Sequence, residues 1–200
     1  KVKFILETFE KDMNVLGDSN QTVTSVKASK KSLRTLFVSS SAYTYSDLDS
    51  VSQDTSYTKM YKYLKQWTSN GSHSQLVFNY AKMQVDGIYI NQKRNSYQVK
   101  VNVKKKMVFS SVDTVFSDVD STYRLDTNEV KKFIDLDFYF HVTKEYDAFT
   151  DFKIEAISKH GVQPKYYKKL SSLTLYWVSL DPTWKKIVGE RFKFPEVPND

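Results

Sequence analysis

Regular alternation of apolar and polar residues along three segments constrains the fold of this chain more than any other feature. The clearest segment is "FIDLDFYFHV", residues 133–142, in which every even-numbered residue is apolar. Successive side chains of a β-strand point to opposite faces of the sheet, so this pattern is typical of a strand with one apolar face. Residues 97–104 and 151–156 alternate in the same way. Three such strands predict an antiparallel sheet that is covered on one side by helices.

The N-terminal half supplies helices for this purpose. Residues 1–16 place apolar side chains at helical spacing, and Gly17 follows as a stop signal. Residues 54–69 show the same spacing with an aromatic stripe, and Asp54 is the predicted N-cap. A short helix is also predicted within residues 30–38. The expected fold class is α+β, with N-terminal helices packed on an antiparallel β-sheet.

Turn and cap signals indicate where the remaining elements begin and end. Asp86-Gly87 and Tyr146-Asp147 are predicted to be turns between strands. Residues 173–180 have the composition of a further strand, and Asp181-Pro182 is a typical start of a helix. We therefore expect the chain to end in a strand and a helix that extend the main domain.

The length of 200 residues suits one domain with an appendage. We assign residues 1–160 to a helix-plus-antiparallel-sheet domain and residues 161–200 to a C-terminal extension packed on the same domain. The chain begins at Lys1, which we interpret as a mature form from which a leader was removed. No apolar run approaches the roughly 20 residues needed to span a bilayer. We therefore expect an extracytoplasmic protein, either periplasmic or at the cell surface.

Composition excludes several classes of chemistry. Cysteine is absent, so disulfides, thiolate metal sites and cysteine nucleophiles are excluded. The five glycines lie too far apart to form a glycine-rich phosphate loop, which excludes nucleotide enzymes of those types. Lys and Arg together number 30 against 23 Asp and Glu, but the lysines are dispersed along the chain. A nucleic-acid binder would need a contiguous basic stripe, so we do not expect nucleic acid as a partner.

The order of elements, with helices first and then long strands that end in the phrase "DFKIEAIS", resembles the nuclear transport factor 2-like, or cystatin-like, superfamily. The resemblance covers roughly residues 1–160 and is strongest to uncharacterised exported proteins of Bacteroides-type bacteria. It implies a cone of curved sheet wrapped around the N-terminal helices. Members of the superfamily include isomerases, dehydratases, transport adaptors and secretion-system assembly domains, so the resemblance does not by itself name a function.

The polar face of residues 133–142 raises the question of catalysis, because it carries Asp135, Asp137, Tyr139 and His141. These residue types perform acid–base chemistry, and in enzymes of the superfamily such groups project into the cone, where burial tunes their acidity. Here the apolar residues should face the cone. We therefore predict that the four polar residues form an outer, solvent-exposed surface, that nearby lysines form exposed ion pairs with the aspartates, and that the protein is not an enzyme.

Two other patterns imitate metal sites. Residues 118–129 space their acidic residues like a calcium-binding loop, but Tyr123 stands where the sharp turn requires glycine. The three histidines, His73, His141 and His160, lack the spacing of metal ligands. We expect no metal and no cofactor.

Aromatic residues on the expected inner faces are candidates for lining a ligand pocket at the open end of the cone, although core packing explains them as well. The candidate ligand-binding residues are Tyr57, Tyr61, Trp67, Tyr80, Phe138 and Phe140. The expected function is a non-enzymatic extracytoplasmic module that binds a protein, a glycan or a small apolar ligand, and a homodimer is among the assemblies considered. The alternatives are a cone-pocket isomerase, dehydratase or hydrolase, and a basic nucleic-acid-binding domain.

Overall fold

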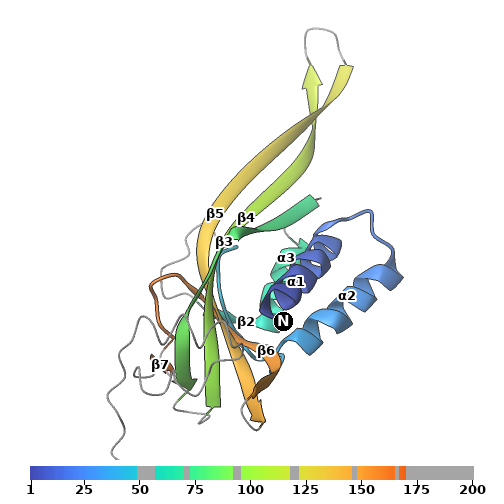
Figure 1. The fold of residues 1–200 in the computed structure, drawn as a ribbon. Coiled ribbons are helices and arrows are strands. Elements are labelled where there is room, and N and C mark those ends of the chain that lie inside the picture. The colour runs from blue at the N-terminus through green and yellow to red at the C-terminus, as the bar shows by residue number, and fades with distance from the viewer. Residues whose placement is uncertain are drawn as a thin grey trace, which may run out of the picture.

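The computed structural model describes residues 1–48, 57–69, 73–91, 96–117, 122–145, 148–164 and 167–169. It contains three helices packed against a seven-stranded, mostly antiparallel sheet, and Figure 1 shows the helices on one side of that sheet. The predicted α+β class is confirmed. The strand predicted at residues 173–180 and the helix predicted after it lie outside the described residues. Within the described ranges, no helix is long and apolar enough to cross a membrane.

The helical layer consists of α1 (Val2–Gly17), α2 (Val23–Leu36) and α3 (Met60–Ser69). α1 agrees with the helix predicted at residues 1–16. α2 is longer than the short helix predicted within residues 30–38. It begins earlier because Thr22 caps its first turn, where the hydroxyl oxygen of Thr22 accepts a hydrogen bond from the backbone N–H of Ser25 at 3.2 Å.

The helix predicted at residues 54–69 begins only at Met60, which corrects the prediction. Residues Tyr57–Lys59 form a short strand, β2, that pairs antiparallel with β1 (Tyr43–Tyr45). Tyrosine and threonine suit a strand, and the neighbouring edge of β1 decides the conformation in favour of the sheet. The predicted N-cap, Asp54, lies outside the described residues.

Long strands make up the rest of the sheet: β3 (His73–Asn91), β4 (Ser96–Ser117), β5 (Thr122–Glu145), β6 (Ala148–Lys159) and the short β7 (Tyr167–Lys169). Their order across the sheet is β2-β1-β6-β5-β4-β3-β7, and only β1 and β6 run parallel. The chain therefore places β4 and β5 near the centre of the sheet.

The turn predicted at Asp86-Gly87 is wrong, because both residues lie within β3. The pairing of β3 with β4 shifts between Val85 and Gly87, so Asp86 is an extra residue on the β3 side. A β-bulge of this kind bends a strand without ending it, and turn-like residues are tolerated there. The bulge redirects the side chain of Asp86, which contributes to the polar cluster described below.

The hydrophobic core lies between α1 and the even-numbered face of β5, as the alternation predicts. Phe138 and Phe140 are fully buried. The ring of Phe138 meets Phe9 of α1 edge-on at a centroid distance of 6.0 Å, and Phe78 of β3 at 5.6 Å. The predicted apolar face of residues 133–142 is therefore confirmed as the face that packs on the helices.

Gly17 permits a close contact between the end of α1 and the sheet. A Cβ atom at this position would lie 2.0 Å from the backbone oxygen of Ser74, which is far inside contact distance. Only glycine lets the helix end approach β3 this closely. The neighbouring Asp18 and His73 form an isolated antiparallel bridge at the same point.

β4 and β5 extend well beyond their neighbours in the sheet. Pairing of β4 with β3 stops at Ser110, and pairing of β5 with β6 starts at Leu136. The two long strands nevertheless remain paired with each other as far as Ser117 and Thr122. Figure 1 shows the result as a long, twisted two-stranded arm that projects away from the helices.

Candidate functional site

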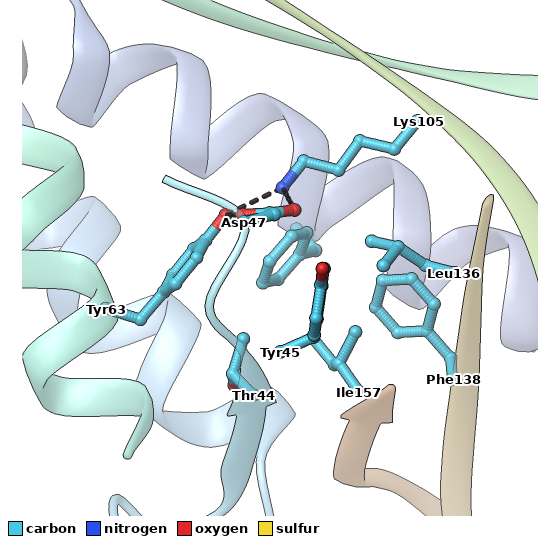
Figure 2. Close-up of a pocket in the computed structure, with 9 residues that line it drawn as sticks. Thr44, Tyr45, Asp47, Tyr63, Lys105, Leu136, Phe138 and Ile157 are labelled. Atoms are coloured by element: carbon cyan, nitrogen blue, oxygen red, sulfur yellow. Dashed lines mark hydrogen bonds and ion pairs between the residues drawn. The ribbon is translucent and has the colours of Figure 1, made fainter. Parts of the chain in front are cut away.

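An ionic cluster is fully buried between the helices and the sheet, where Lys105 of β4 meets Tyr63 of α3 and Asp47, which follows β1 (Figure 2). The Lys105 ammonium donates to Oδ2 of Asp47 at 2.8 Å and to the hydroxyl oxygen of Tyr63 at 2.7 Å. The Tyr63 hydroxyl donates in turn to Oδ1 of Asp47 at 2.8 Å. The three groups therefore satisfy one another's hydrogen-bonding capacity in a place where water is excluded.

Burial sets the acid–base behaviour of this cluster. Loss of hydration lowers the pKa of the Lys105 ammonium, and the Asp47 carboxylate opposes that shift only in part. Burial raises the pKa of the Tyr63 hydroxyl well above its ordinary range, and the charge of Asp47 adds to the effect. The Lys105 ammonium also lies over the rings of Tyr63 and Trp67, at 5.3 Å and 5.8 Å from their centroids.

The cavity beside this cluster is too small for a substrate. Its volume is about 10 Å³, which is room for a single water molecule. Its lining consists of Phe9, Thr44, Tyr45, Asp47, Tyr63, Lys105, Leu136, Phe138 and Ile157, most of which Figure 2 labels. The cluster therefore joins α3 and the segment after β1 to the centre of the sheet, and the described interior around it is filled.

A second polar cluster lies on the opposite face of the sheet, around Asp137 of β5. The Lys100 ammonium donates to Oδ2 of Asp86 at 2.6 Å and pairs with Oδ2 of Asp137 at 3.1 Å. The side-chain amide of Asn102 donates to Oδ1 of Asp137 at 3.0 Å, and Nδ1 of His160 lies 2.8 Å from the same oxygen. Asp137 is therefore a buried carboxylate that three neighbouring side chains stabilise.

The two carboxylates control the charge of Lys100. Burial by itself would lower the pKa of this ammonium, but the hydrogen bonds to Asp86 and Asp137 outweigh burial and raise it above the ordinary lysine value. Burial raises the pKa of the neighbouring Tyr139, and the positive charge of Lys100 opposes that shift. Lys100 therefore stays charged and Tyr139 stays neutral over the physiological pH range.

His160 is the group in this cluster that remains accessible, since half of its side chain is exposed. Its Nδ1 lies 2.8 Å from Oδ1 of Asp137 and 2.9 Å from the side-chain amide nitrogen of Asn102. The cross-strand neighbour of Asp137 is Ser158, whose hydroxyl is fully buried and is therefore not available to a bound molecule.

The outer-surface prediction for β5 is correct for Asp135 and wrong for Asp137 and Tyr139. The Asp135 side chain is 41% exposed and pairs with Lys104 at 3.6 Å, as predicted. Asp137 and Tyr139 are buried at 0% and 1% exposure, because Lys100 neutralises the first and Tyr89 packs edge-on against the second at 5.5 Å. His141, the fourth residue, is partly buried.

A shallow hollow of about 610 Å³ lies where β3, β4 and β5 run side by side. Val77, Lys106 and Phe133 lie directly beside one another across the three strands. Two residues earlier in β4, Lys104 lies beside Asp135 of β5. Phe133 is 72% exposed and Val77 38% exposed. The hollow is lined by Val77, Phe78, Asn79, Tyr80, Lys104, Lys105, Lys106, Phe133, Ile134 and Asp135.

The six candidate ligand-binding residues occupy different environments. Trp67, Phe138 and Phe140 are buried in the core, and the indole N–H of Trp67 donates to the backbone oxygen of Met13 at 2.8 Å. Tyr61 is half exposed on α3.

Tyr57 and Tyr80 are the two partly buried candidates. Tyr57 packs against Tyr45, with ring centroids 6.4 Å apart. Tyr80 lines the hollow, and its hydroxyl donates to Glu10 of α1 at 2.8 Å. The structure therefore divides the six residues among the core, the surface of α3, the strand β2 and the hollow.

Sequence reasoning missed both polar clusters, although a signal for the inner one was present. In β4 the alternation places Lys105 on the same face as Val103 and Met107, both of which are buried. A lysine on an apolar face predicts a buried cation with an acidic partner. No comparable signal indicates Asp86 or His160, because Asp86 reaches Lys100 from a bulge in β3 and His160 reaches Asp137 from just beyond the end of β6.

Metal binding has no candidate in the part of the chain that the structure describes, where no three histidine or acidic side chains gather as a ligand set. The calcium-like pattern at residues 118–129 includes residues 118–121, which lie outside the described ranges.

Comparisons with known proteins identify no relative. No protein-family model matches this chain, and neither curated proteins nor solved structures provide a match. The function therefore has to be argued from the residues of the chain itself.

Proposed function

We propose that this protein is a non-enzymatic binding module and that it binds its ligand in the hollow over Val77, Lys106 and Phe133. The observation that carries the proposal is the difference in room between the hollow and the cavity beside Lys105. The hollow measures about 610 Å³, whereas the cavity beside Lys105 measures about 10 Å³. Ligand sites occupy roughly 300–1,000 Å³, so the hollow has the size of a binding site and the inner cavity does not.

The chemistry of the hollow favours an acidic peptide with apolar side chains. Phe133 and Val77 present apolar surface on either side of Lys106, and Lys104 adds a second cation in the next row. The ion pair between Lys104 and Asp135 is exposed and weak, so a ligand carboxylate can compete for the lysine. The excess of Lys and Arg over Asp and Glu, 30 against 23, also attracts anionic partners.

A pair of labelled peptides tests this proposal. One peptide alternates glutamate with leucine or phenylalanine, and the other carries lysine in place of glutamate. Fluorescence anisotropy is expected to show binding of the acidic peptide, and Lys106→Glu should weaken that binding at least about tenfold, because the ligand carboxylates lose their cation and meet a like charge. Lys62→Glu on the exposed surface of α3 makes the same charge change elsewhere and should have a much smaller effect.

Two results would contradict the proposal. One is equal weakening by the Lys106 and Lys62 variants, which would indicate a response to net charge alone. The other is binding of the acidic peptide that Lys106→Glu leaves unchanged, which would place the site elsewhere on the molecule.

We also propose that the sheet curves around the helices as in the nuclear transport factor 2-like superfamily, and that the protein works outside the cytoplasm. The order of elements, helices before long antiparallel strands, supports the first proposal. An experimental structure that superimposes on members of that superfamily is the test for it. Fractionation of cells that carry the native gene tests the second.

A further inference from the structure

One edge of β5 has no strand partner over a long stretch of the described structure. β6 pairs with β5 from Leu136 onward, and the backbone N–H of His160 donates to the backbone oxygen of Asp135 at 2.9 Å. Before Asp135, the described strands supply a neighbour to β5 only on the β4 side. An unpaired edge of this length is a template for pairing with another chain.

The direction of the backbone groups along this edge follows from the bond to Asp135. Its carbonyl points toward the β6 side, and the N–H and C=O groups of a strand residue point to the same side and alternate from residue to residue. The register between β4 and β5 runs without a shift through this stretch. Thr127, Glu129, Lys131 and Phe133 therefore direct their backbone N–H and C=O groups to the open edge.

The side chains along the edge are exposed and partly apolar. Every residue from Thr127 to Lys131 is exposed, with Val130 at 63% exposure and Phe133 at 72%. Natural edge strands are usually short, bulged or strongly charged when they remain unpaired. This one is long and regular, it carries two exposed hydrophobic side chains, and its charged residues, Glu129, Lys131 and Lys132, include both signs, so a second copy can match them.

The edge is complementary to itself. When two copies are placed antiparallel about a two-fold axis at Val130, Val130 faces Val130 of the second copy, Glu129 faces Lys131, and Thr127 faces Phe133. The pairs beside the axis join Glu129 to Lys131 and Thr127 to Phe133. The backbone groups of these residues point to the open edge, so the pairs take the hydrogen-bonded positions of an antiparallel ladder. Each glutamate lies opposite a lysine, and the apolar valines meet at the axis.

We propose that residues 127–133 of β5 pair antiparallel with the same residues of a second copy, so that two sheets join into one continuous sheet. Figure 1 shows β5 running from the sheet into the projecting arm, away from the helices. The proposal and ligand binding in the hollow share Phe133 but use different parts of it, the backbone groups for pairing and the side chain for the ligand. The hollow occupies a face of the sheet, whereas this pairing uses the backbone edge.

Charge exchange across the two-fold axis tests the proposal with the full chain. In wild-type protein, sedimentation velocity is expected to show a monomer–dimer equilibrium that depends on concentration. Glu129→Lys places lysines opposite each other across the interface, and Lys131→Glu does the same with glutamates, so each variant alone should dimerise at least about tenfold more weakly. An equimolar mixture of the two variants restores every opposite-charge pair and should form dimers again.

The mixture separates the proposed interface from a structural effect within one chain. Glu129 and Lys131 also form an exposed ion pair with each other at 3.3 Å, and each variant breaks that pair. Mixing cannot restore this internal pair, so rescue by mixing requires contact between chains. Glu7→Lys on α1 is the matched control and should dimerise like wild type. Circular dichroism of each variant verifies that it is folded.

Three results would overturn the proposal: a wild-type protein that is monomeric at every concentration, single variants that dimerise as well as wild type, and a mixture that stays monomeric. Peptide binding gives a separate readout, because the proposed ligand site predicts that the monomeric Glu129→Lys variant still binds the acidic peptide.

Discussion

Lys100 and Lys105 of β4 are buried on opposite faces of the sheet, and their pKa values shift in opposite directions. Lys105 has one carboxylate partner, Asp47, and burial outweighs it, so the pKa of Lys105 falls. Lys100 has two, Asp86 and Asp137, which outweigh burial and raise its pKa. The number of acidic neighbours, rather than depth alone, therefore decides the charge behaviour of a buried lysine.

The Lys105–Asp47 pair is expected to stabilise the fold mainly by avoiding an unpaired buried charge. Lys105→Met leaves the Asp47 carboxylate without its cation and should cost about 3–5 kcal/mol in urea unfolding. The double variant Lys105→Met/Asp47→Leu removes both charges, so its cost should be about 1–3 kcal/mol less than the sum of the single costs.

Lys104→Met is the control for that cycle, because Lys104 is the adjacent residue and its pair with Asp135 is exposed. Its cost should stay below about 1 kcal/mol. Equal costs for the Lys104 and Lys105 variants would show that the buried pair contributes no more than the surface pair.

At the scale of one element, β5 has two faces with different tasks. Its even-numbered face supplies the core through Phe138 and Phe140, and its odd-numbered face carries Phe133 and Asp135 at the surface and Asp137 in the second polar cluster. One strand thus builds the helix-facing core, the wall of the hollow and the support of Lys100. Its continuous register with β4 holds these three regions at fixed spacing.

Truncation on the two faces of β5 should have very different effects. Phe138→Ala or Phe140→Ala removes a fully buried ring and should reduce the free energy of unfolding by about 3–5 kcal/mol. Phe133→Ala, in the same strand, removes a ring that is 72% exposed and should change it by less than about 0.5 kcal/mol. Denaturant unfolding measures all three. A similar loss for Phe133→Ala and Phe138→Ala would mean that the face assignment is reversed.

At the scale of the whole molecule, the pKa shifts predict loss of stability at alkaline pH. Lys100 and the tyrosines Tyr63, Tyr80 and Tyr139 all have raised pKa values in the folded state. Such groups bind protons more tightly when the protein is folded. Their contribution to stability is therefore complete below the unfolded tyrosine pKa of about 10, and it is lost as the pH rises through the folded values.

Ionisation of Lys105 has the opposite effect on stability. Because its pKa is lowered in the folded state, the unfolded state binds the proton more tightly, so this group makes the fold more stable as the pH rises toward the unfolded lysine pKa. The groups with raised values outnumber it, so the urea midpoint should be lower at about pH 11 than at about pH 9. Tyr139→Phe removes one of these groups and should make the decrease smaller. An identical midpoint at the two pH values would show that the shifts are absent in solution.

Sequence patterns alone determined the α+β class, the helix at residues 1–16 and the core face of β5, because these depend on the period of apolar residues within one segment. The start of α3 was predicted too early, and a turn was predicted at Asp86, where the structure has a bulge within β3. In both places pairing with another strand overrides the local helix or turn signal. The exposed pair between Lys104 and Asp135 was anticipated from alternation, whereas burial of Asp137 was not.

Only the tertiary structure decided what the polar residues do. Asp135 and Asp137 lie on the same face of one strand, yet the first is partly exposed and the second is fully buried, because Lys100, Asn102 and His160 converge only on the second. Asp47 and Tyr63 meet Lys105 from 58 and 42 residues away in the chain. Alternation determines the face on which a side chain lies. Register, bulges and the ends of neighbouring strands decide which groups surround it, and these are properties of several segments packed together.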